Sequence, residues 1–172
     1  MRANLSSMRK LVVFLIMLMT SAMVFAQDLA KFKLYTPGDN AEQKINRAIK
    51  KAKKEGKHVF IQVGGNWCIW CARFNAFVTS DKKIDSIMKA DYIFYPMNHT
   101  EEDPNKKLLA KYEYPQRFGF PVFLILNGDG KLLHTQTSSY LGDGKDGYDK
   151  DKVYALFRDW RPEAFDPNRY KD

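Results

Sequence analysis

Cysteine is nearly absent from this sequence: the 172 residues include only two, Cys68 and Cys71. Histidine is almost as scarce, and its three residues stand far apart along the chain. A small disulfide-stapled domain needs several cysteine pairs. A structural zinc site needs about four closely spaced Cys or His ligands. The composition therefore excludes a disulfide framework and argues against a structural zinc site.

Long apolar runs are also missing, apart from one near the N-terminus. Residues 1–10 carry three basic residues and no acid, and Leu11 to Phe25 form a nearly unbroken apolar run. This run is shorter than the about 20 residues that span a bilayer. A basic start, an apolar stretch and a cleavage pattern ending at Ala26 are typical of a signal peptide. We therefore expect residues 1–26 to be removed and the protein to be exported, periplasmic or secreted. An uncleaved membrane anchor is the alternative.

Acidic residues are outnumbered, since 28 Lys and Arg face 20 Asp and Glu and give a net charge of +8. Many of the basic residues lie in 41–55, where Ile45, Ala48, Ile49 and Ala52 recur at helical spacing. A basic face on an amphipathic helix is usually a solvated face. No nucleic-acid-binding motif accompanies the charge, so we expect no nucleic-acid partner.

The two cysteines stand between a predicted strand and a predicted helix. Residues 59–63 read as a buried strand, a glycine-containing turn follows, and residues 72–78 read as a helix. In this context a C-x-x-C motif indicates redox chemistry. The N-terminus of a helix favours an anion, so the pKa of Cys68 should fall below its ordinary value of about 8.5. We expect Cys68 to be an exposed nucleophile and Cys71, about one turn later, to be a buried resolving thiol.

Other roles for the cysteine pair remain open at this point. The pair could be a static disulfide, although a bridge across so short a loop constrains the unfolded chain little. It could instead capture a soft metal such as Cu(I) through both thiolates. Attachment of c-type haem is excluded because Ala72, not histidine, follows the second cysteine.

The remaining pattern alternates strands and helices. Further strands are predicted at 92–97, 122–126 and 131–137, and further helices at 81–88, 104–112 and 152–160. Residues 138–150, rich in Gly, Asp and Lys, read as a mobile loop. This order predicts an α/β fold with a mixed central sheet and helices on both faces. Residues 27–40 form a lead-in, 41–160 the domain and 161–172 a C-terminal tail.

Two motifs give the chain a resemblance to the thioredoxin superfamily, and in particular to exported bacterial members with a W-C-x-W-C site. The motifs are Trp67-Cys68-Ile69-Trp70-Cys71 and Gly119-Phe120-Pro121-Val122-Phe123. The resemblance implies a thioredoxin fold, no cofactor and a cis peptide bond at Phe120–Pro121. It also implies a substrate groove formed by the neighbours of the cysteines: Trp67, Ile69, Trp70, Phe120 and Pro121.

One position departs from the family pattern. Thioredoxins have a buried aspartate six residues before the first cysteine, and this sequence has Gln62 there. A neutral amide cannot act as a general base, although it can hold a water molecule. The dipeptide Ile69-Trp70 also differs from the Gly-Pro of thioredoxins, so the reduction potential cannot be transferred.

These observations predict an enzyme, a thiol–disulfide oxidoreductase acting on protein disulfides outside the cytoplasm through Cys68 and Cys71. Reduction or interchange is favoured over oxidation because the sequence shows no inserted helical domain. The expected partners are disulfide-containing or dithiol proteins and a membrane or periplasmic thiol electron donor, and the protein is expected to be a monomer. The alternatives are a non-catalytic binding or chaperone-like module and a Cu(I)-capturing protein.

Overall fold

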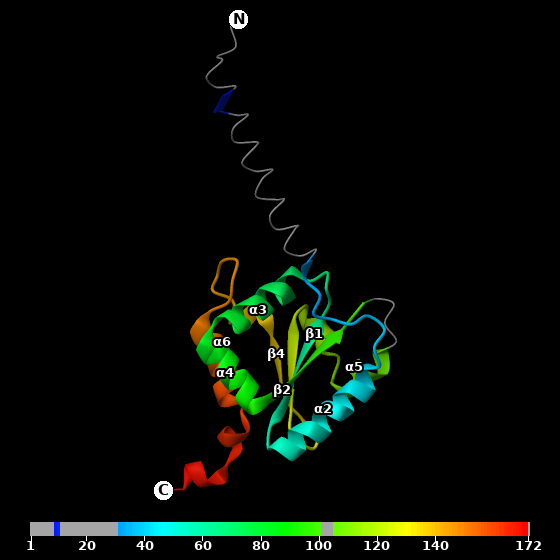
Figure 1. The fold of residues 1–172 in the computed structure, drawn as a ribbon, viewed down its shortest axis with the longest axis vertical. Helices are drawn as coiled ribbons and strands as arrows, with labels where there is room; N and C mark the ends of the chain where they lie inside the picture. Colours follow the sequence, from blue (N-terminus) through cyan, green and yellow to red (C-terminus); the bar gives the residue numbers. More distant parts are fainter. Residues whose placement is uncertain (1–8, 11–30, 101–104, 172) are drawn as a thin grey trace, which may run out of the picture. The chain divides into compact units, whose positions relative to one another are not determined.

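A four-stranded mixed sheet with the strand order β2-β1-β3-β4 runs through the fold (Figure 1). Strand β1 (His58–Gly64) pairs in parallel with β2 (Tyr92–Asn98) and antiparallel with β3 (Val122–Leu126). Strand β3 also pairs antiparallel with β4 (Leu132–Thr137). The predicted α/β class with a mixed central sheet is therefore confirmed.

The structure is a computed structural model, and it describes residues 9–10, 31–100 and 105–171. Residues from Lys33 onward form one compact unit. The predicted signal peptide, residues 1–26, lies outside the described residues except for positions 9 and 10. Across the described parts of the chain, no helix combines the length and the apolar character that crossing a membrane requires.

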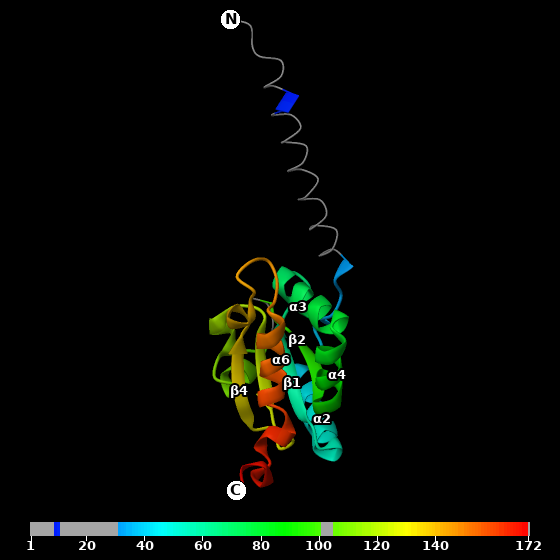
Figure 2. The ribbon, with the colours of Figure 1, turned by 90° about the vertical axis from the view of Figure 1, so that its left-hand side faces the viewer.

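Helices cover both faces of the sheet, as predicted (Figures 1 and 2). Helices α2 (Ala41–Glu55) and α5 (Lys106–Lys111) pack on one face. The other face carries three helices, α3 (Ile69–Ser80), α4 (Lys82–Asp91) and α6 (Lys150–Asp159). Each face of the sheet therefore has its own hydrophobic core.

Strand β1 contributes to both cores because successive side chains of a strand point to opposite faces. Val59, Ile61 and Val63 lie in the core under α2 and α5. Phe60 lies in the core under α3, α4 and α6. Gln62 shares the orientation of Phe60, and its side chain reaches the backbone of Cys71 in α3. The strand is buried along its whole length.

The ends of α2 follow from local sequence, and the predicted helix at 41–55 is confirmed. The side chain of Asn40 accepts a hydrogen bond from the backbone N–H of Gln43 at 2.9 Å, which caps the first turn. Gly56 ends the helix in the left-handed conformation with φ of 64°. The lysines of this helix are exposed, in agreement with a solvated basic face.

The segment that follows β4 differs from the prediction. Residues 138–150 were expected to form a mobile loop, but Ser138–Leu141 form a short 3-10 helix, η2, and Gly142 bridges to Tyr148. Leu141 and Tyr148 are buried, with exposed fractions of 4% and 5%. These two side chains enter the core beside α3 and α6, so the segment is anchored at both ends.

Three other short 3-10 helices complete the described chain. Helix η1 (Pro115–Phe118) precedes β3. Helices η3 (Pro162–Phe165) and η4 (Pro167–Tyr170) form the tail after α6. The ring of Phe165 lies 5.5 Å from the ring of His58, so the tail contacts the start of β1.

Candidate active site

The site is built where β1 ends and α3 begins. The backbone N–H of Cys68 donates to the carbonyl oxygen of Gly65 at 3.0 Å, which closes a tight turn. A Cβ atom at Gly64 would collide with the sulfur of Cys71 and would lie 2.8 Å from the hydroxyl oxygen of Tyr35. A Cβ atom at Gly65 would overlap the indole of Trp67. The two glycines therefore let the start of α3 approach the end of the strand.

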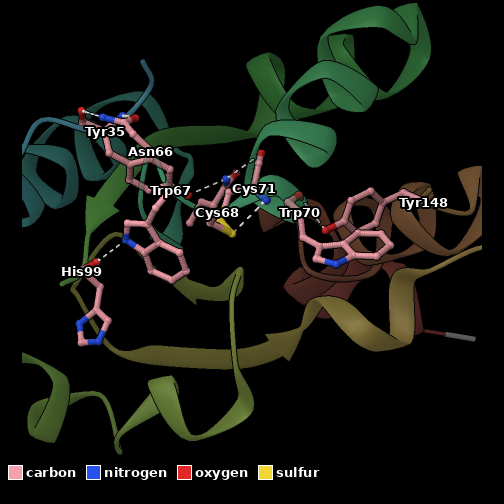
Figure 3. The surroundings of a disulfide bond; sticks show 9 residues. Tyr35, Asn66, Trp67, Cys68, Trp70, Cys71, His99 and Tyr148 are labelled. Carbon is pink, nitrogen blue, oxygen red and sulfur yellow. Dashed lines mark hydrogen bonds between the residues drawn. A yellow bond between two sulfur atoms is a disulfide. The ribbon is translucent and has the colours of Figure 1, made fainter. Parts of the chain in front are cut away.

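Cys68 and Cys71 form a disulfide, with their Cα atoms 5.2 Å apart. Cys68 is the N-cap of α3, and its sulfur accepts a hydrogen bond from the backbone N–H of Cys71 at 3.1 Å (Figure 3). The first turn of α3 carries no acidic residue. The unpaired N–H groups and the dipole of the helix therefore favour a thiolate at Cys68 once the disulfide opens.

The exposure of Cys68 differs from the prediction. Its exposed fraction is 5%, and that of Cys71 is 0%. The expectation of an exposed Cys68 is therefore wrong for the disulfide-bonded state, because its sulfur turns toward the buried start of α3. Cys71 is the more buried of the two cysteines, as expected for a resolving thiol.

Trp67 and Trp70 lie on opposite sides of the cysteine pair (Figure 3). Trp67 is 52% exposed, and its Nε1–H donates to the carbonyl oxygen of His99 at 3.2 Å. Its ring meets the ring of Phe120 edge-on at 5.4 Å, and Phe120 in turn stacks on the ring of His99 at 4.9 Å. Trp67 therefore exposes a large apolar surface, and its contacts with Phe120 and His99 fix the orientation of its ring.

Trp70 is half-buried and is fixed from two sides. The guanidinium of Arg73 lies 4.7 Å above its ring, and the ring of Tyr148 meets it edge-on at 5.9 Å. The Tyr148 hydroxyl donates to the carbonyl oxygen of Trp70 at 3.1 Å. The segment after β4 thus supports the first turn of α3, a contact that the sequence did not reveal.

The Phe120–Pro121 peptide bond is cis, as the resemblance implied. Gly119 precedes it with φ of 78°, a conformation that favours glycine. Pro121 is buried, and the loop meets the cysteine motif through the contact between Phe120 and Trp67. The structure therefore brings the two sequence motifs together.

A cavity of about 600 Å³ opens beside Trp70 and this loop. One wall is formed by Trp70, Phe118, Gly119 and Phe120. The other is formed by residues from β4 to α6: Thr137, Ser138, Ser139, Gly142, Gly144, Lys145, Gly147 and Lys152. Two lysines and no acidic residue belong to this described lining. Ile69, the first residue of α3, is half-buried and is not among these lining residues.

Gln62 lies behind the disulfide and is 1% exposed. Its Nε2 group donates to the Tyr35 hydroxyl at 2.7 Å and more weakly to the carbonyl oxygen of Cys71 at 3.4 Å. Burial raises the pKa of Tyr35 well above its usual range. The sequence predicted neither contact, because Tyr35 lies in the lead-in, far from Gln62 along the chain. In the described parts of the chain, no group of three or more His, Cys, Asp or Glu is arranged to hold a metal ion.

The sequence around this site matches a known domain family. A family model described as thioredoxin-like domain matches residues 45–143. The thiol:disulfide interchange protein DsbD of Escherichia coli K12 is 29% identical over 87 residues, which is 51% of this chain and 14% of that protein. The same protein of Escherichia coli O6:H1 matches to the same extent. The match thus spans only about a seventh of the length of these relatives.

Two solved structures share the fold. A disulphide isomerase from Xylella fastidiosa Temecula1 superposes with a TM-score of 0.60 at 21% identity, covering 72% of this chain and 93% of that one. The oxidised C-terminal domain of DsbD from Neisseria meningitidis gives a TM-score of 0.51 at 21% identity, covering 70% and 96%. The predicted thioredoxin fold is therefore confirmed. Since the family model covers more than half of the sequence, the chain belongs to the thioredoxin-like domain family.

Proposed function

We propose that this chain is a thiol–disulfide oxidoreductase that acts on protein disulfides through Cys68 and Cys71. The observation that carries the proposal is the position of Cys68 as the N-cap of α3, disulfide-bonded to a fully buried Cys71. This position favours the thiolate of Cys68, which is the reactive form in exchange. The names of the relatives, thiol:disulfide interchange protein and disulphide isomerase, agree with it.

The reaction has two exchange steps. The thiolate of Cys68 attacks one sulfur of a substrate disulfide, an S–S bond forms to Cys68, and the other substrate sulfur leaves as a thiolate. The thiolate of Cys71 then attacks the Cys68 sulfur. The Cys68–Cys71 bond forms, the bond to the substrate breaks, and the substrate leaves with both sulfurs reduced. The protein is left oxidised, and a dithiol donor must reduce it for another cycle.

The substrate class follows from the surface around the cysteines. Exposed Trp67 and the cavity between Trp70, Phe120 and the segment after β4 together offer a binding surface larger than a single disulfide needs. An extended polypeptide on either side of a cystine would contact both. In this proposal Trp67, Trp70 and Phe120 bind the substrate chain, with Ile69 and the buried Pro121 as further predicted members of the groove.

The proposal extends to direction, location and partners. We expect reduction or interchange, with a reduction potential at or below about −220 mV. The protein would act as a monomer outside the cytoplasm, after removal of residues 1–26, and would be reduced by a membrane or periplasmic thiol donor. The predicted signal peptide supports the location.

The test of the activity uses reduced full-length protein and a polypeptide with an interchain disulfide. Cys68→Ser is expected to lower the rate by about a thousandfold or more, because no nucleophile remains. Cys71→Ser should accumulate a mixed disulfide with the substrate, detected as an increase in mass. Thr79→Ser, an exposed change at the far end of α3, is the matched control. An undiminished rate in Cys68→Ser would overturn the proposal and favour a binding module.

The direction and the location need separate measurements. Equilibration with glutathione, followed by thiol alkylation and mass analysis, gives the reduction potential. A value near −120 mV is typical of a strong oxidant and would overturn the reductive direction. Fractionation of cells that express the full chain with a C-terminal tag tests export, and a cytosolic product of unchanged mass would contradict it.

A further inference from the structure

Tyr35 reaches the disulfide from the lead-in that precedes α2. The residue is 4% exposed, and its hydroxyl lies beside both Gln62 and the space in front of Gly64. A carbon atom placed as the Cβ of Gly64 would lie 2.8 Å from the Tyr35 hydroxyl oxygen and closer still to the sulfur of Cys71. The hydroxyl oxygen and the sulfur therefore border the same small space.

The backbone of Tyr35 is held in place by one side chain of the active-site turn. The N–H of Tyr35 donates to Oδ1 of Asn66 at 3.0 Å, and Nδ2 of Asn66 donates to the carbonyl oxygen of Tyr35 at 2.9 Å (Figure 3). Asn66 lies two residues before Cys68. The turn that presents the cysteines thus also fixes the tyrosine that lies behind them.

The contacts of Gln62 define the direction of the Tyr35 hydroxyl. One end of the Gln62 amide lies near both the carbonyl oxygen of Cys71 and the Tyr35 hydroxyl. A carbonyl oxygen only accepts, so this end is the NH₂ group. The Tyr35 oxygen therefore accepts from Gln62, and its own proton points away from the amide. A phenol keeps its proton at neutral pH, and burial, which raises the pKa of Tyr35, disfavours the loss of that proton further.

We propose that the Tyr35 hydroxyl donates a hydrogen bond to the sulfur of Cys71 when the disulfide is open, and so stabilises the resolving thiolate. This inference rests on the proposed function. Gln62 is a neutral amide and cannot accept the proton of Cys71, so this proton leaves to water and the thiolate that forms needs a hydrogen-bond donor. A buried thiolate without a donor would be costly, and one hydrogen bond from a phenol offsets much of that cost.

The step that depends on Tyr35 is the release of the substrate. The thiol of Cys71 loses its proton to water, and the Tyr35 O–H donates to the resulting thiolate. This thiolate attacks the Cys68 sulfur, the Cys68–Cys71 bond forms, and the bond between Cys68 and the substrate breaks. The substrate sulfur leaves with the electron pair and takes up a proton from water. In the reverse direction, Tyr35 stabilises Cys71 as the leaving thiolate.

The test measures the pKa of Cys71 alone, in full-length protein carrying Cys68→Ser. Ultraviolet absorbance of the thiolate is followed against pH. Adding Tyr35→Phe removes only the hydroxyl and is expected to raise the pKa of Cys71 by about one to two units, the effect of a hydrogen bond to a charged group. The matched control is Tyr92→Phe, which also removes a buried hydroxyl, one that donates to the carbonyl oxygen of Phe157. It should leave the pKa of Cys71 unchanged.

A kinetic measurement separates this role from a purely structural one. With both cysteines present, Tyr35→Phe should slow the resolution of the mixed disulfide about tenfold at neutral pH, and the rate should recover as the pH rises. If Tyr35→Phe does not fold, Asn66→Ala gives the same readouts, because it releases the backbone of Tyr35. An unchanged Cys71 pKa in the folded variant would overturn the inference. The titration needs no substrate, so its outcome is independent of whether the parent protein reduces polypeptides.

Discussion

Gly64 is the residue on which the packing behind the disulfide depends most directly. Its missing side chain leaves room for the sulfur of Cys71 and the hydroxyl of Tyr35, which come from segments on either side of it in the sequence. Neither neighbour can move easily: Cys71 belongs to the first turn of α3, and Tyr35 is fixed by Asn66. The requirement for glycine here is therefore one of space.

We predict that Gly64→Ala lowers the free energy of unfolding by about 1–3 kcal/mol, the usual cost of overpacking a buried position. Gly142→Ala is the matched control, because its Cβ would meet no atom closer than 3.6 Å and its φ of −69° suits alanine. Urea unfolding of both oxidised variants measures the difference. Equal stability of Gly64→Ala and the parent would mean that the Cys71 sulfur and the Tyr35 hydroxyl do not pack against Gly64 as observed.

At the same scale, Trp67 offers a prediction about substrate binding. Its ring is more than half exposed, although Phe120 and His99 hold it in one orientation. Trp67→Ala should raise KM for a polypeptide disulfide about tenfold, since an exposed aromatic anchor contributes about 1–2 kcal/mol to binding. The rate with a small-molecule disulfide should change little. A similar loss with both substrates would show that Trp67 acts on the cysteines instead of on the polypeptide.

Among the elements, the segment after β4, residues 138–149, has a structural role that its composition does not suggest. Its tip is exposed, but Leu141 and Tyr148 are buried at its two ends, and the Tyr148 hydroxyl bonds to the first turn of α3. Between them, Gly142, Gly144, Lys145 and Gly147 contribute to one wall of the cavity beside Trp70. This segment therefore links the shape of the cavity to the position of the cysteine motif.

Replacing residues 143–147 with two glycines tests this role. Gly142 and Tyr148 already form an antiparallel bridge, which a two-residue turn can close. We predict that KM for a polypeptide disulfide rises about tenfold, which corresponds to about 1.4 kcal/mol of binding. The reduction potential and the exchange with a small disulfide should stay unchanged. A shift of the reduction potential would instead indicate that the segment stabilises one redox state of the cysteine pair.

The elements differ in how well the sequence predicts them, and the reason is the range of the interactions involved. Helix α2 was predicted with its observed ends because its apolar stripe and Gly56 are local signals. The fully buried strand β3 and the hairpin to β4 were predicted for the same reason. The cysteine motif needed only its position between a strand and a helix.

Predictions failed where burial depends on distant partners. The segment 138–150 has the composition of a mobile loop, and nothing near Tyr148 in the sequence reveals that its ring packs against Phe74 and Trp70. Tyr35 stands in a lead-in without periodicity, and its partners Gln62 and Asn66 lie 27 and 31 residues away. The cysteine motif at the start of a helix was therefore predictable, but the residues that surround it were not.

For the molecule as a whole, the two ends of β1 have different roles. Cys68 follows one end, and His58 begins the other. His58 is 8% exposed, its Nδ1–H donates to the carbonyl oxygen of Trp160 at 2.8 Å, and its ring lies against Phe165. Burial lowers the pKa of His58, an effect that outweighs the hydrogen bond to Trp160. His58, which is buried at the end of β1 opposite the cysteines, thus favours its neutral form.

We predict that acid destabilises the protein through His58. In the unfolded chain this histidine takes up a proton near pH 6.5. The folded protein binds that proton only at lower pH, so the unfolded state holds more protons in the interval between the two pKa values. The free energy of unfolding should therefore fall as the pH decreases from about 6.5 to the lowered pKa of the folded state. Urea unfolding at a series of pH values measures this slope.

His58→Asn isolates the contribution of this histidine, because an asparagine amide can still donate to the carbonyl oxygen of Trp160 but does not titrate in this range. The variant should lose stability at neutral pH through poorer packing against Phe165, and its stability should depend less on pH than that of the parent. The reduction potential of the cysteine pair should be the same in both proteins, since the site lies at the opposite end of β1. An equal pH dependence in the variant and the parent would mean that the acid sensitivity arises elsewhere in the molecule.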